Sequence, residues 1–154
     1  MNTVYLGLGS NLGQRDQNIS NALELLAAHD SISVIKFSSN HETLAVSSYQ
    51  QPKFLNSAAE ISTLLTPFEL LEVTEGIEKQ LGRTTKGLGD PRIIDIDILF
   101  YNHDIISTDQ LTIPHALTHE RLFVIHPLCE IAPTFEHPVM NISIEDLKHE
   151  LQGY

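Results

Sequence analysis

The sequence has no tryptophan and a single cysteine, Cys129, among its 154 residues. One cysteine cannot form a disulfide within the chain, which is typical of proteins in a reducing cytoplasm. No apolar run approaches the ~18 residues that a membrane-spanning helix requires. The first residues have neither the basic region nor the apolar segment of a secretory signal. These absences favour a cytoplasmic protein without a membrane span.

Basic residues are also scarce. Nine lysines and arginines stand against twenty acids, which gives a net charge of −11. A chain with this charge is a poor general binder of nucleic acid or of anionic membranes, so we expect neither as a partner. Four of the bases nevertheless lie close together, namely Lys79, Arg83, Lys86 and Arg92. This concentration fits a local anion site and a solvated basic loop equally well.

The length and the hydrophobic fraction of 42% are those of one globular domain, residues 1–154. No internal repeat or linker interrupts it. Apolar spacing predicts alternating segments of strand and helix. The predicted strands are 4–9, 32–38, 54–65 and 93–101, the predicted helices are 15–28, 66–82, 117–122 and 143–151, and the long loops are 40–53 and 83–91. Because this order has no strict βαβ alternation, it favours an α+β sandwich with a largely antiparallel sheet.

The clearest chemical signal lies in the predicted strand 93–101, where Asp95 and Asp97 alternate with isoleucines. Side chains alternate between the faces of a strand, so the two aspartates share one face, about 6.6–6.8 Å apart at Cα. Burying two unpaired carboxylates is unfavourable, and a divalent cation relieves their repulsion. Oxygen-only ligands suit Mg²⁺, and two metals about 3.5–4 Å apart can bridge such a pair. The pattern therefore predicts a magnesium site, and the alternative is an exposed strand face with solvated aspartates.

A glycine-containing segment, residues 7–13, follows the first predicted strand and precedes a helix. The dinucleotide-binding fingerprint places its third glycine three residues after the second. In this chain Gly13 comes four residues after Gly9, and the lysine of a phosphate-binding loop is missing. The segment fits a tight turn in which Ser10 or Asn11 caps the helix, and it also fits close approach of a ligand to the backbone.

Two further groups of residues are candidates for ligand binding. Phe54 and Asn56 share a strand face, where a ring can stack on a flat heterocycle and an amide can pair with its edge. The alternative, which the sequence alone favours, is that Phe54 belongs to the core. His115 and Arg121 can contact phosphate, with Arg121 carried by the short helix 117–122. The alternative for these two residues is a loop histidine and a surface arginine.

Taken together, the motifs resemble one family. The blocks that carry the resemblance are YLGLGSNLG at 5–13, FLN at 54–56, PRIIDIDIL at 91–99, LTIPH at 111–115, ERLFV at 120–124 and PLCEIAP at 127–133. In this order they resemble the 6-hydroxymethyl-7,8-dihydropterin pyrophosphokinases of folate biosynthesis. The resemblance implies a three-layer α/β/α sandwich with a ferredoxin-like core. It also implies transfer of the pyrophosphoryl group of ATP to the hydroxymethyl oxygen of the pterin, with release of AMP. We expect the protein to be a monomer.

The resemblance also implies roles for individual residues. Asp95 and Asp97 look like the ligands of two Mg²⁺ ions and, with Arg83 and Arg92, like the catalytic residues. The positions that resemble the ATP site are Leu71, Glu78, Arg83, Arg92, Ile98, Thr112, His115 and Arg121. The positions that resemble the pterin site are Thr43, Leu44, Val46, Phe54, Asn56, Asp95 and Phe123. In this arrangement Phe54 and Phe123 stack on opposite faces of the pterin.

The chain departs from the family pattern in the segment 84–90, which has Thr85 where an arginine is common and no tryptophan. Two other classes of function remain as alternatives. One is a pterin- or nucleotide-binding module without catalysis. The other is a Mg²⁺-dependent phosphohydrolase that uses Asp95 and Asp97. The reaction products separate the three, since only the pyrophosphokinase forms AMP in a pterin-dependent way.

Overall fold

The computed structural model describes residues 1–43, 53–82 and 93–152. The main sheet has the strand order β2-β4-β1-β5, and β3 extends the β2 edge along β4. Every strand pairing among the described residues is antiparallel. The strands of this sheet are β1 (Asn2–Ser10), β2 (Ile32–Phe37), β3 (His41–Thr43), β4 (Phe54–Thr63) and β5 (Asp95–Tyr101). A separate pair consists of β6 (Ile106–Ser107) and β7 (Thr112–Ile113).

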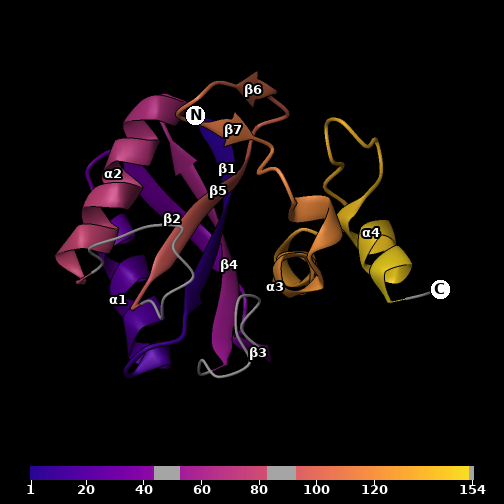
Figure 1. Cartoon of the computed structure of the whole chain (residues 1–154). Coiled ribbons are helices and arrows are strands. Elements are labelled where there is room, and N and C mark those ends of the chain that lie inside the picture. The colour runs from indigo at the N-terminus through magenta and orange to yellow at the C-terminus, as the bar shows by residue number, and fades with distance from the viewer. Residues whose placement is uncertain (44–52, 83–92, 153–154) are drawn as a thin grey trace.

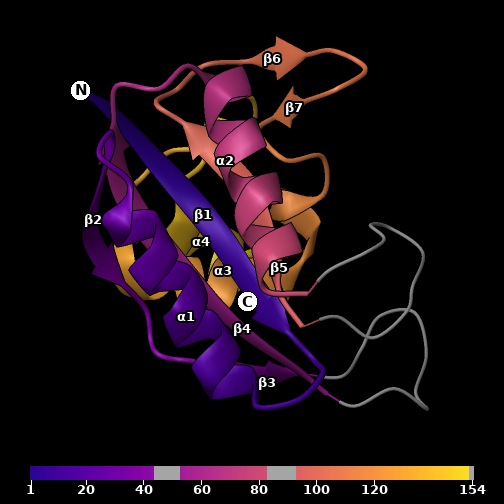
Figure 2. The same cartoon turned by 90° about the vertical axis from the view of Figure 1, so that its left-hand side faces the viewer.

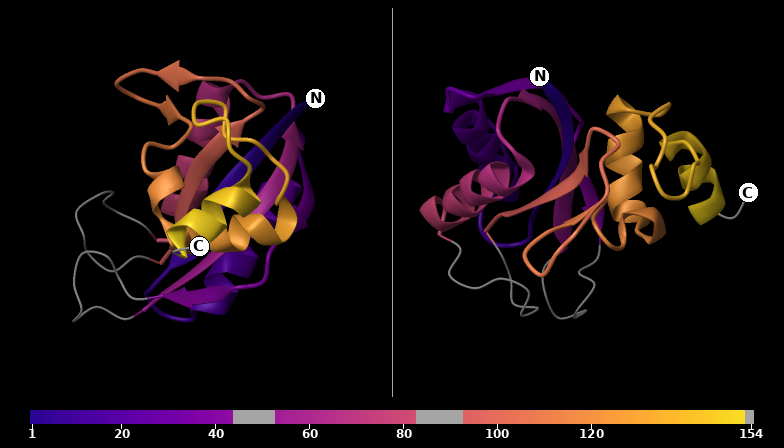
Figure 3. Two further views of the ribbon diagram at one scale, coloured as in Figure 1. Left: turned by 90° about the vertical axis from the view of Figure 1, so that its right-hand side faces the viewer. Right: turned by 90° about the horizontal axis from the view of Figure 1, so that it is seen from above.

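Helices cover both faces of the main sheet (Figure 1). One face carries α1 (Arg15–Ala28) and α2 (Pro67–Gln80) side by side (Figure 2). The other face carries α3 (Leu122–Ile131), and α4 (Ile144–Leu151) lies outside α3, as the view from above shows (Figure 3). The units β1-α1-β2 and β4-α2-β5, with this strand order, form a ferredoxin-like core. The predicted α/β/α sandwich with an antiparallel sheet is thus confirmed.

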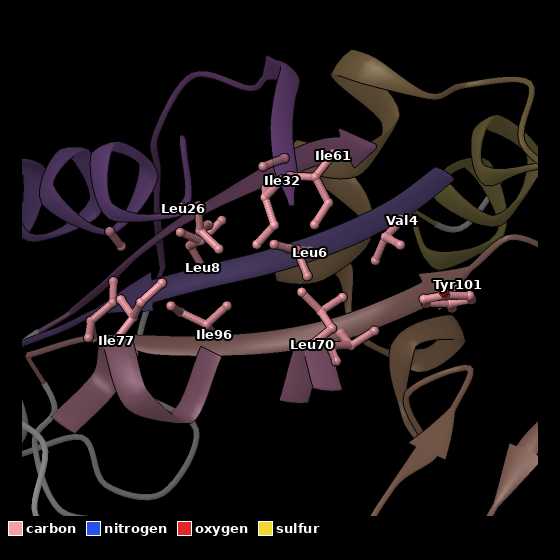
Figure 4. Close-up of a cluster of buried hydrophobic side chains, with 14 of the residues drawn as sticks. Val4, Leu6, Leu8, Leu26, Ile32, Ile61, Leu70, Ile77, Ile96 and Tyr101 are labelled. Atoms are coloured by element: carbon pink, nitrogen blue, oxygen red, sulfur yellow. The ribbon is translucent and has the colours of Figure 1, made fainter. Parts of the chain in front are cut away.

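The larger core lies between the sheet and helices α1 and α2 (Figure 4). Val4, Leu6 and Leu8 are at most 2% exposed and point into it from β1. Because side chains alternate along a strand, Gly7 and Gly9 belong to the opposite face, which is covered by α3. The apolar spacing of β1 therefore determines which face of the sheet packs against α1 and α2 and which face turns toward α3.

A second core lies between the sheet and helices α3 and α4. Leu99 and Phe100 are adjacent in sequence and both belong to it. The pairing of β1 with β5 shifts between Tyr5 and Leu6, so that Leu6 lies opposite Ile98 and Tyr5 opposite Phe100. This irregularity inserts Leu99 as an extra residue, which turns two consecutive side chains toward α3.

Local sequence signals account for the helix ends. Thr66 and Glu69 form a capping box at the start of α2, with Thr66 Oγ1 accepting from Glu69 N at 3.2 Å. Gly82, which has φ of +111°, follows the end of α2 as expected for a glycine after a helix. Ser143 is the N-cap residue of α4, and its Oγ accepts from Asp146 N at 3.1 Å.

Three local predictions are wrong. Neither Ser10 nor Asn11 caps α1, since this helix begins after Gln14 and Ser10 Oγ accepts a bond from Asn18. The predicted loop 40–53 begins with strand β3, which is too short and too polar to show alternation. The predicted helix 117–122 is one 3₁₀ turn, Thr118–Glu120, followed by α3.

Helix α3 escaped prediction because its sequence is apolar on nearly every side. It lies between the sheet and α4, so burial on two sides removes the polar face that reveals a helical period. Pro127 lies inside it and is a residue that ordinarily breaks helices. Arg121 consequently precedes the helix as its N-cap residue. No helix in the described part of the chain is long and apolar enough to cross a membrane.

Candidate active site

The two aspartates lie on β5 with their side chains on the α3 face of the sheet. Asp95 and Asp97 are half-buried, whereas Ile94, Ile96 and Ile98 are at most 4% exposed in the opposite core. The alternation predicted from the sequence is therefore confirmed. Two carboxylates with a partly solvated face are oxygen donors of the kind that Mg²⁺ uses together with substrate phosphates.

Glycines separate these aspartates from the next polar group on the sheet. Gly9 pairs with Asp95 on one side and with Asn56 on the other, and Gly7 pairs with Asp97 and with Ala58. The sheet face between Asn56 and Asp95 therefore consists of bare backbone. A Cβ added to Gly9 would lie 3.1 Å from Asn56 Oδ1 and 3.6 Å from Phe54 Cδ1. A side chain at this position would therefore press on Asn56, and glycine leaves the amide room.

His115 is brought against the aspartates by a backbone hydrogen bond. Its N–H donates to Leu99 O at 3.1 Å, next to the end of the aspartate pair. Its Nε2 lies 3.9 Å from Asp97 Oδ1, and both side chains are about one-third exposed. Thr112 lies nearby in sequence on β7 and is exposed. A cationic His115 would balance part of the negative charge of Asp97.

The N-terminus of α3 presents Arg121 and Phe123. The guanidinium carbon of Arg121 lies 5.6 Å from the centroid of the Phe123 ring, a cation–π contact. Across the sheet, Phe54 is half-buried and Asn56 is 8% exposed. The predicted stacking residues thus come from β4 and from α3, on the face that also carries the aspartates.

Glu78, Leu71 and Ile98 lie on the other side of the sheet. Leu71 and Ile98 pack in the core formed with α1 and α2. Glu78 is 2% exposed, and its Oε2 accepts a hydrogen bond from Ile96 N at 2.8 Å. Ile96 is the residue between the two aspartates, so this carboxylate fixes the backbone that carries them. No local sequence pattern indicates this bond. It forms because β5 lies at the end of the strand order, which only the folded sheet determines.

Several predicted residues lie outside the described part of the chain, namely Leu44, Val46, Arg83 and Arg92. Thr43 is described through its backbone, which pairs with Phe54. Among the described residues, no group of three or more His, Cys, Asp or Glu side chains is arranged to hold a metal ion. The pair Asp95 and Asp97 remains a donor set that fits Mg²⁺, and Asp95 Oδ1 is buried from solvent.

Sequence reasoning missed one polar network on this face of the sheet. Glu130 of α3 contacts Ser39 and His41 at the edge of the sheet. Glu130 lies in the block PLCEIAP, which contributed to the resemblance without any role assigned to this residue. Only the fold brings residues about 90 positions apart into contact.

Residues 5–133 match the family model described as 7,8-dihydro-6-hydroxymethylpterin-pyrophosphokinase (HPPK). The chain belongs to this family. Among curated relatives, the 2-amino-4-hydroxy-6-hydroxymethyldihydropteridine pyrophosphokinase of Bacillus subtilis is 47% identical over 135 residues, covering 88% of this chain and 81% of the relative. The protein of the same name from Aquifex aeolicus is 39% identical over 150 residues, covering 97% of this chain and 92% of the relative.

Some members of the family are parts of longer proteins. The Folic acid synthesis protein FOL1 of Dictyostelium discoideum is 43% identical over 150 residues, which are 97% of this chain and 22% of that protein. The crystal structure of wild-type Plasmodium falciparum HPPK-DHPS with pteroate matches with a TM-score of 0.79 and 18% identity, covering 97% of this chain and 42% of that one. At this identity the match confirms the fold. The family and its curated members make this chain an ATP-dependent pyrophosphokinase of folate synthesis.

Proposed function

We propose that residues 1–154 form one pyrophosphokinase domain that transfers the pyrophosphoryl group of ATP to the hydroxymethyl oxygen of 6-hydroxymethyl-7,8-dihydropterin and releases AMP. One observation carries the assignment of the site. The aspartates of β5 and the pair Phe54 and Asn56 of β4 share one sheet face, separated only by the backbone of Gly9. A carboxylate pair for phosphates thus adjoins an aromatic and amide pair for a heterocycle.

The pterin is proposed to bind between β4 and α3. Phe54 and Phe123 stack on its two faces, and the buried Asn56 amide pairs with its edge as donor and acceptor. Asp95 lies on the same side of the sheet and faces the hydroxymethyl group. Thr43, Leu44 and Val46 complete the proposed pterin site.

ATP is proposed to bind beside the aspartates. Arg121 and His115 contact phosphate oxygens, together with Thr112, Arg83 and Arg92. Ile98 contributes its backbone, since its side chain is in the core, and Leu71 and Glu78 support β5 from behind. These groups hold the phosphates in line with the attacking hydroxyl, and positioning of this kind supplies much of the acceleration of phosphoryl transfer.

Asp95 and Asp97 are proposed to hold two Mg²⁺ ions. When bound, such ions neutralise the charge of the phosphates and help to activate the hydroxyl. His115, with its Nε2 3.9 Å from Asp97 Oδ1, orients that carboxylate. We also propose that the enzyme is a monomer and that it acts in the cytoplasm. The single cysteine supports the second point.

The test is product analysis with the purified protein, ATP, Mg²⁺ and 6-hydroxymethyl-7,8-dihydropterin. The proposal expects AMP that forms only when the pterin is present. Release of ADP or phosphate without pterin would instead establish a phosphohydrolase. Binding of the pterin without any nucleotide product would establish a binding module.

A further inference from the structure

Both oxygens of the Glu130 carboxylate have hydrogen-bond partners although the side chain is 40% exposed. Its Oε1 accepts a hydrogen bond from Ser39 N at 3.0 Å. Its Oε2 accepts from Ser39 Oγ at 2.9 Å and lies 2.5 Å from His41 Nε2. The pKa of Glu130 is lowered, chiefly by the hydrogen bond from Ser39 N and next by the hydrogen bond with His41. The contacts therefore favour the ionised carboxylate.

These contacts join α3 to the edge of the sheet. Glu130 lies in the last turn of α3, whereas Ser39 precedes β3 and His41 is the first residue of that strand. The rings of His41 and His126, the latter also on α3, are 4.8 Å apart between centroids. The helix is thus fastened to β3 by one carboxylate and by one ring contact.

The strand that Glu130 holds lies directly beside the proposed pterin residues. His41 pairs with Asn56, and Thr43 pairs with Phe54. On the neighbouring segment, Ser38 N donates to Ala58 O at 2.8 Å and Ser38 Oγ accepts from Ala58 N at 2.9 Å. A displacement of β3 therefore acts on Asn56 and Phe54 through adjacent backbone pairs.

The helix that Glu130 holds carries the other stacking residue. Phe123 is in the first turn of α3 and Glu130 in the last. Between them, Ile125 and Leu128 pack on the sheet and are fully buried. Apolar burial is non-directional, so it does not by itself specify the position of the helix along the sheet. A carboxylate with three partners in fixed directions supplies the missing constraint.

We propose that Glu130, acting through Ser39 and His41, is a positioning residue that sets the separation between Phe123 of α3 and Phe54 and Asn56 of β4. The inference rests on the proposed pterin site between these two elements. Within the described part of the chain, the hydrogen bonds of Glu130 go to Ser39 and His41, neither of which is a proposed substrate-binding residue. We expect its effect to be larger for the pterin than for ATP, because both elements that it joins carry proposed pterin residues, whereas among the described residues Arg121 is the one proposed ATP residue that adjoins α3.

The opposite face of the sheet has a comparable contact that serves as a contrast. Arg15 of α1 donates to Glu42 Oε2 at 2.7 Å and to Lys53 O at 2.7 Å. This contact also holds β3 and the start of β4, but it joins them to α1 and not to α3. Glu130, together with the ring contact of His126, ties the strand to the helix carrying Phe123.

The first test is Glu130→Gln, which keeps the size of the side chain and removes its charge and one acceptor. The matched control is Glu24→Gln, an exposed glutamate in the middle of α1. We expect the KM for the pterin to rise about tenfold, the effect of losing roughly one charge-assisted hydrogen bond. The KM for ATP and kcat stay within about twofold of the control on the same scale. Equal increases in both KM values would overturn the proposal.

The second test uses His41 and stays informative if the Glu130 variant folds poorly. His41→Ala removes the partner of Oε2, whereas His41→Gln keeps an amide nitrogen near the position of Nε2. We expect the alanine variant to raise the KM for the pterin and the glutamine variant to restore most of it. In the double variant with Glu130→Gln and His41→Ala, we expect the increase in the KM for the pterin to be less than additive. Both changes break the same contact between Glu130 and His41. Additive effects, or no rescue by glutamine, would contradict the proposal.

Pterin binding by titration calorimetry separates this inference from the proposed function. If the wild-type protein binds the pterin but forms no AMP, the proposed reaction fails and the dissociation constants of the same variants still test Glu130. If the wild-type protein forms AMP and the variants bind the pterin as the control does, only the positioning role fails.

Discussion

At the scale of single residues, the proposed site depends on the side chains of three neighbouring strands, β4, β1 and β5. The carboxylates of Asp95 and Asp97 lie on the α3 face of the sheet, because the alternating isoleucines of this segment are buried on the opposite face. Between them and Asn56, Gly9 carries no side chain. Alternation on β4 and β5 was readable from the sequence, but which strand lies between them was not. The register of β1 decides that a glycine stands at the centre.

Replacement of Asp97 by asparagine tests the carboxylate pair. We expect kcat/KM to fall by about 10²–10³, the usual effect of removing one charge-stabilising group from an active site. Because Asp97 is only partly buried, we expect the variant to remain folded, so that a loss of activity reports on the site. Asp109→Asn, at an exposed position outside the site, is the control for the same chemical change. Steady-state AMP formation at several Mg²⁺ concentrations measures the effect, and activity equal to the control would refute the assignment.

Replacement of Gly9 by alanine tests the close packing on the bare strand. The new Cβ would lie 3.1 Å from Asn56 Oδ1, so the amide must move by a few tenths of an ångström. We expect the KM for the pterin to rise several-fold, about 3- to 10-fold for a shift that weakens one hydrogen bond, with the KM for ATP little changed.

Gly76→Ala is the control for the glycine substitution. A Cβ at this position of α2 meets nothing within 4 Å. Alanine at a helical position is expected to raise the free energy of unfolding by about 0.5–1 kcal/mol without affecting either KM. A pterin KM that is the same for the two variants would show that Asn56 is not constrained by Gly9.

At the scale of elements, two helices on opposite faces of the sheet support the strands of the proposed site. Helix α2 reaches β5 through Glu78, which accepts the Ile96 N–H at the free edge of the sheet. Helix α3 reaches β3 through Glu130 in a similar way. In each case a glutamate of a helix fixes the backbone of an edge strand, and the neighbouring residues of that strand or its partner belong to the proposed site.

Glu78→Ala tests the first of these links. Removal of the carboxylate leaves the buried Ile96 N–H without this acceptor, so we expect the free energy of unfolding to fall by about 1–3 kcal/mol. Because Ile96 lies between the aspartates, kcat should fall even at temperatures where the variant is fully folded. Urea unfolding and AMP formation at 20 °C, a temperature chosen as roughly ambient, are the measurements.

Two variants of the same helix complete that experiment. Glu75→Ala, at an exposed position of α2, should leave both quantities unchanged. Glu78→Gln keeps an acceptor for the Ile96 N–H and should recover part of the stability. A Glu78→Ala enzyme with normal kcat would show that the backbone bond does not position the aspartates.

At the scale of the whole molecule, we expect stability to depend on pH through a histidine that contacts Phe100 of the second core. His137 is 4% exposed, and its Nδ1 accepts from Val139 N and Met140 N, each at 3.1 Å. Burial is the main cause of a lowered pKa of His137, and the charge of His119 adds to it. The folded protein therefore binds this proton less readily than the unfolded chain does.

The sign of the pH dependence follows from this difference. Above the unfolded pKa of about 6.5 both states are neutral at this position. As the pH falls below that value the unfolded chain takes up the proton first, so stability decreases by at most about 1.4 kcal/mol per pH unit and levels off below the folded pKa.

His137→Asn keeps an acceptor near Nδ1 and removes the titration. We expect the wild-type protein to lose more stability than this variant between pH 7.5 and pH 5.5, a window placed around the unperturbed histidine pKa of roughly 6.5. Urea unfolding at both pH values measures the difference, and exposed His149→Asn is the control. Equal losses in the wild type and in His137→Asn would exclude His137 as the source.

The sequence by itself determined the elements whose pattern is local. Residues close together in the sequence specify four such features, so that periodicity and capping patterns reveal them. These are helix α1, the capping box of α2, the alternation of β5 and the cap of α4. The acidic pair was found for the same reason, and the ordered blocks identified the family. What local rules could not give was α3, because burial on both sides erases its polar face, and β3, because three polar residues have no period.

Only the tertiary structure decided how these pieces meet. The register of β1 between β4 and β5 places Gly9 between Asn56 and Asp95. The bonds of Glu78 and Glu130 join residues 18 and about 90 positions apart. Contacts over such separations depend on the packing of whole layers, since the strands and helices must first be in place before their side chains can reach one another. The residue types of the site are therefore specified locally by the sequence, and their geometry arises from the fold.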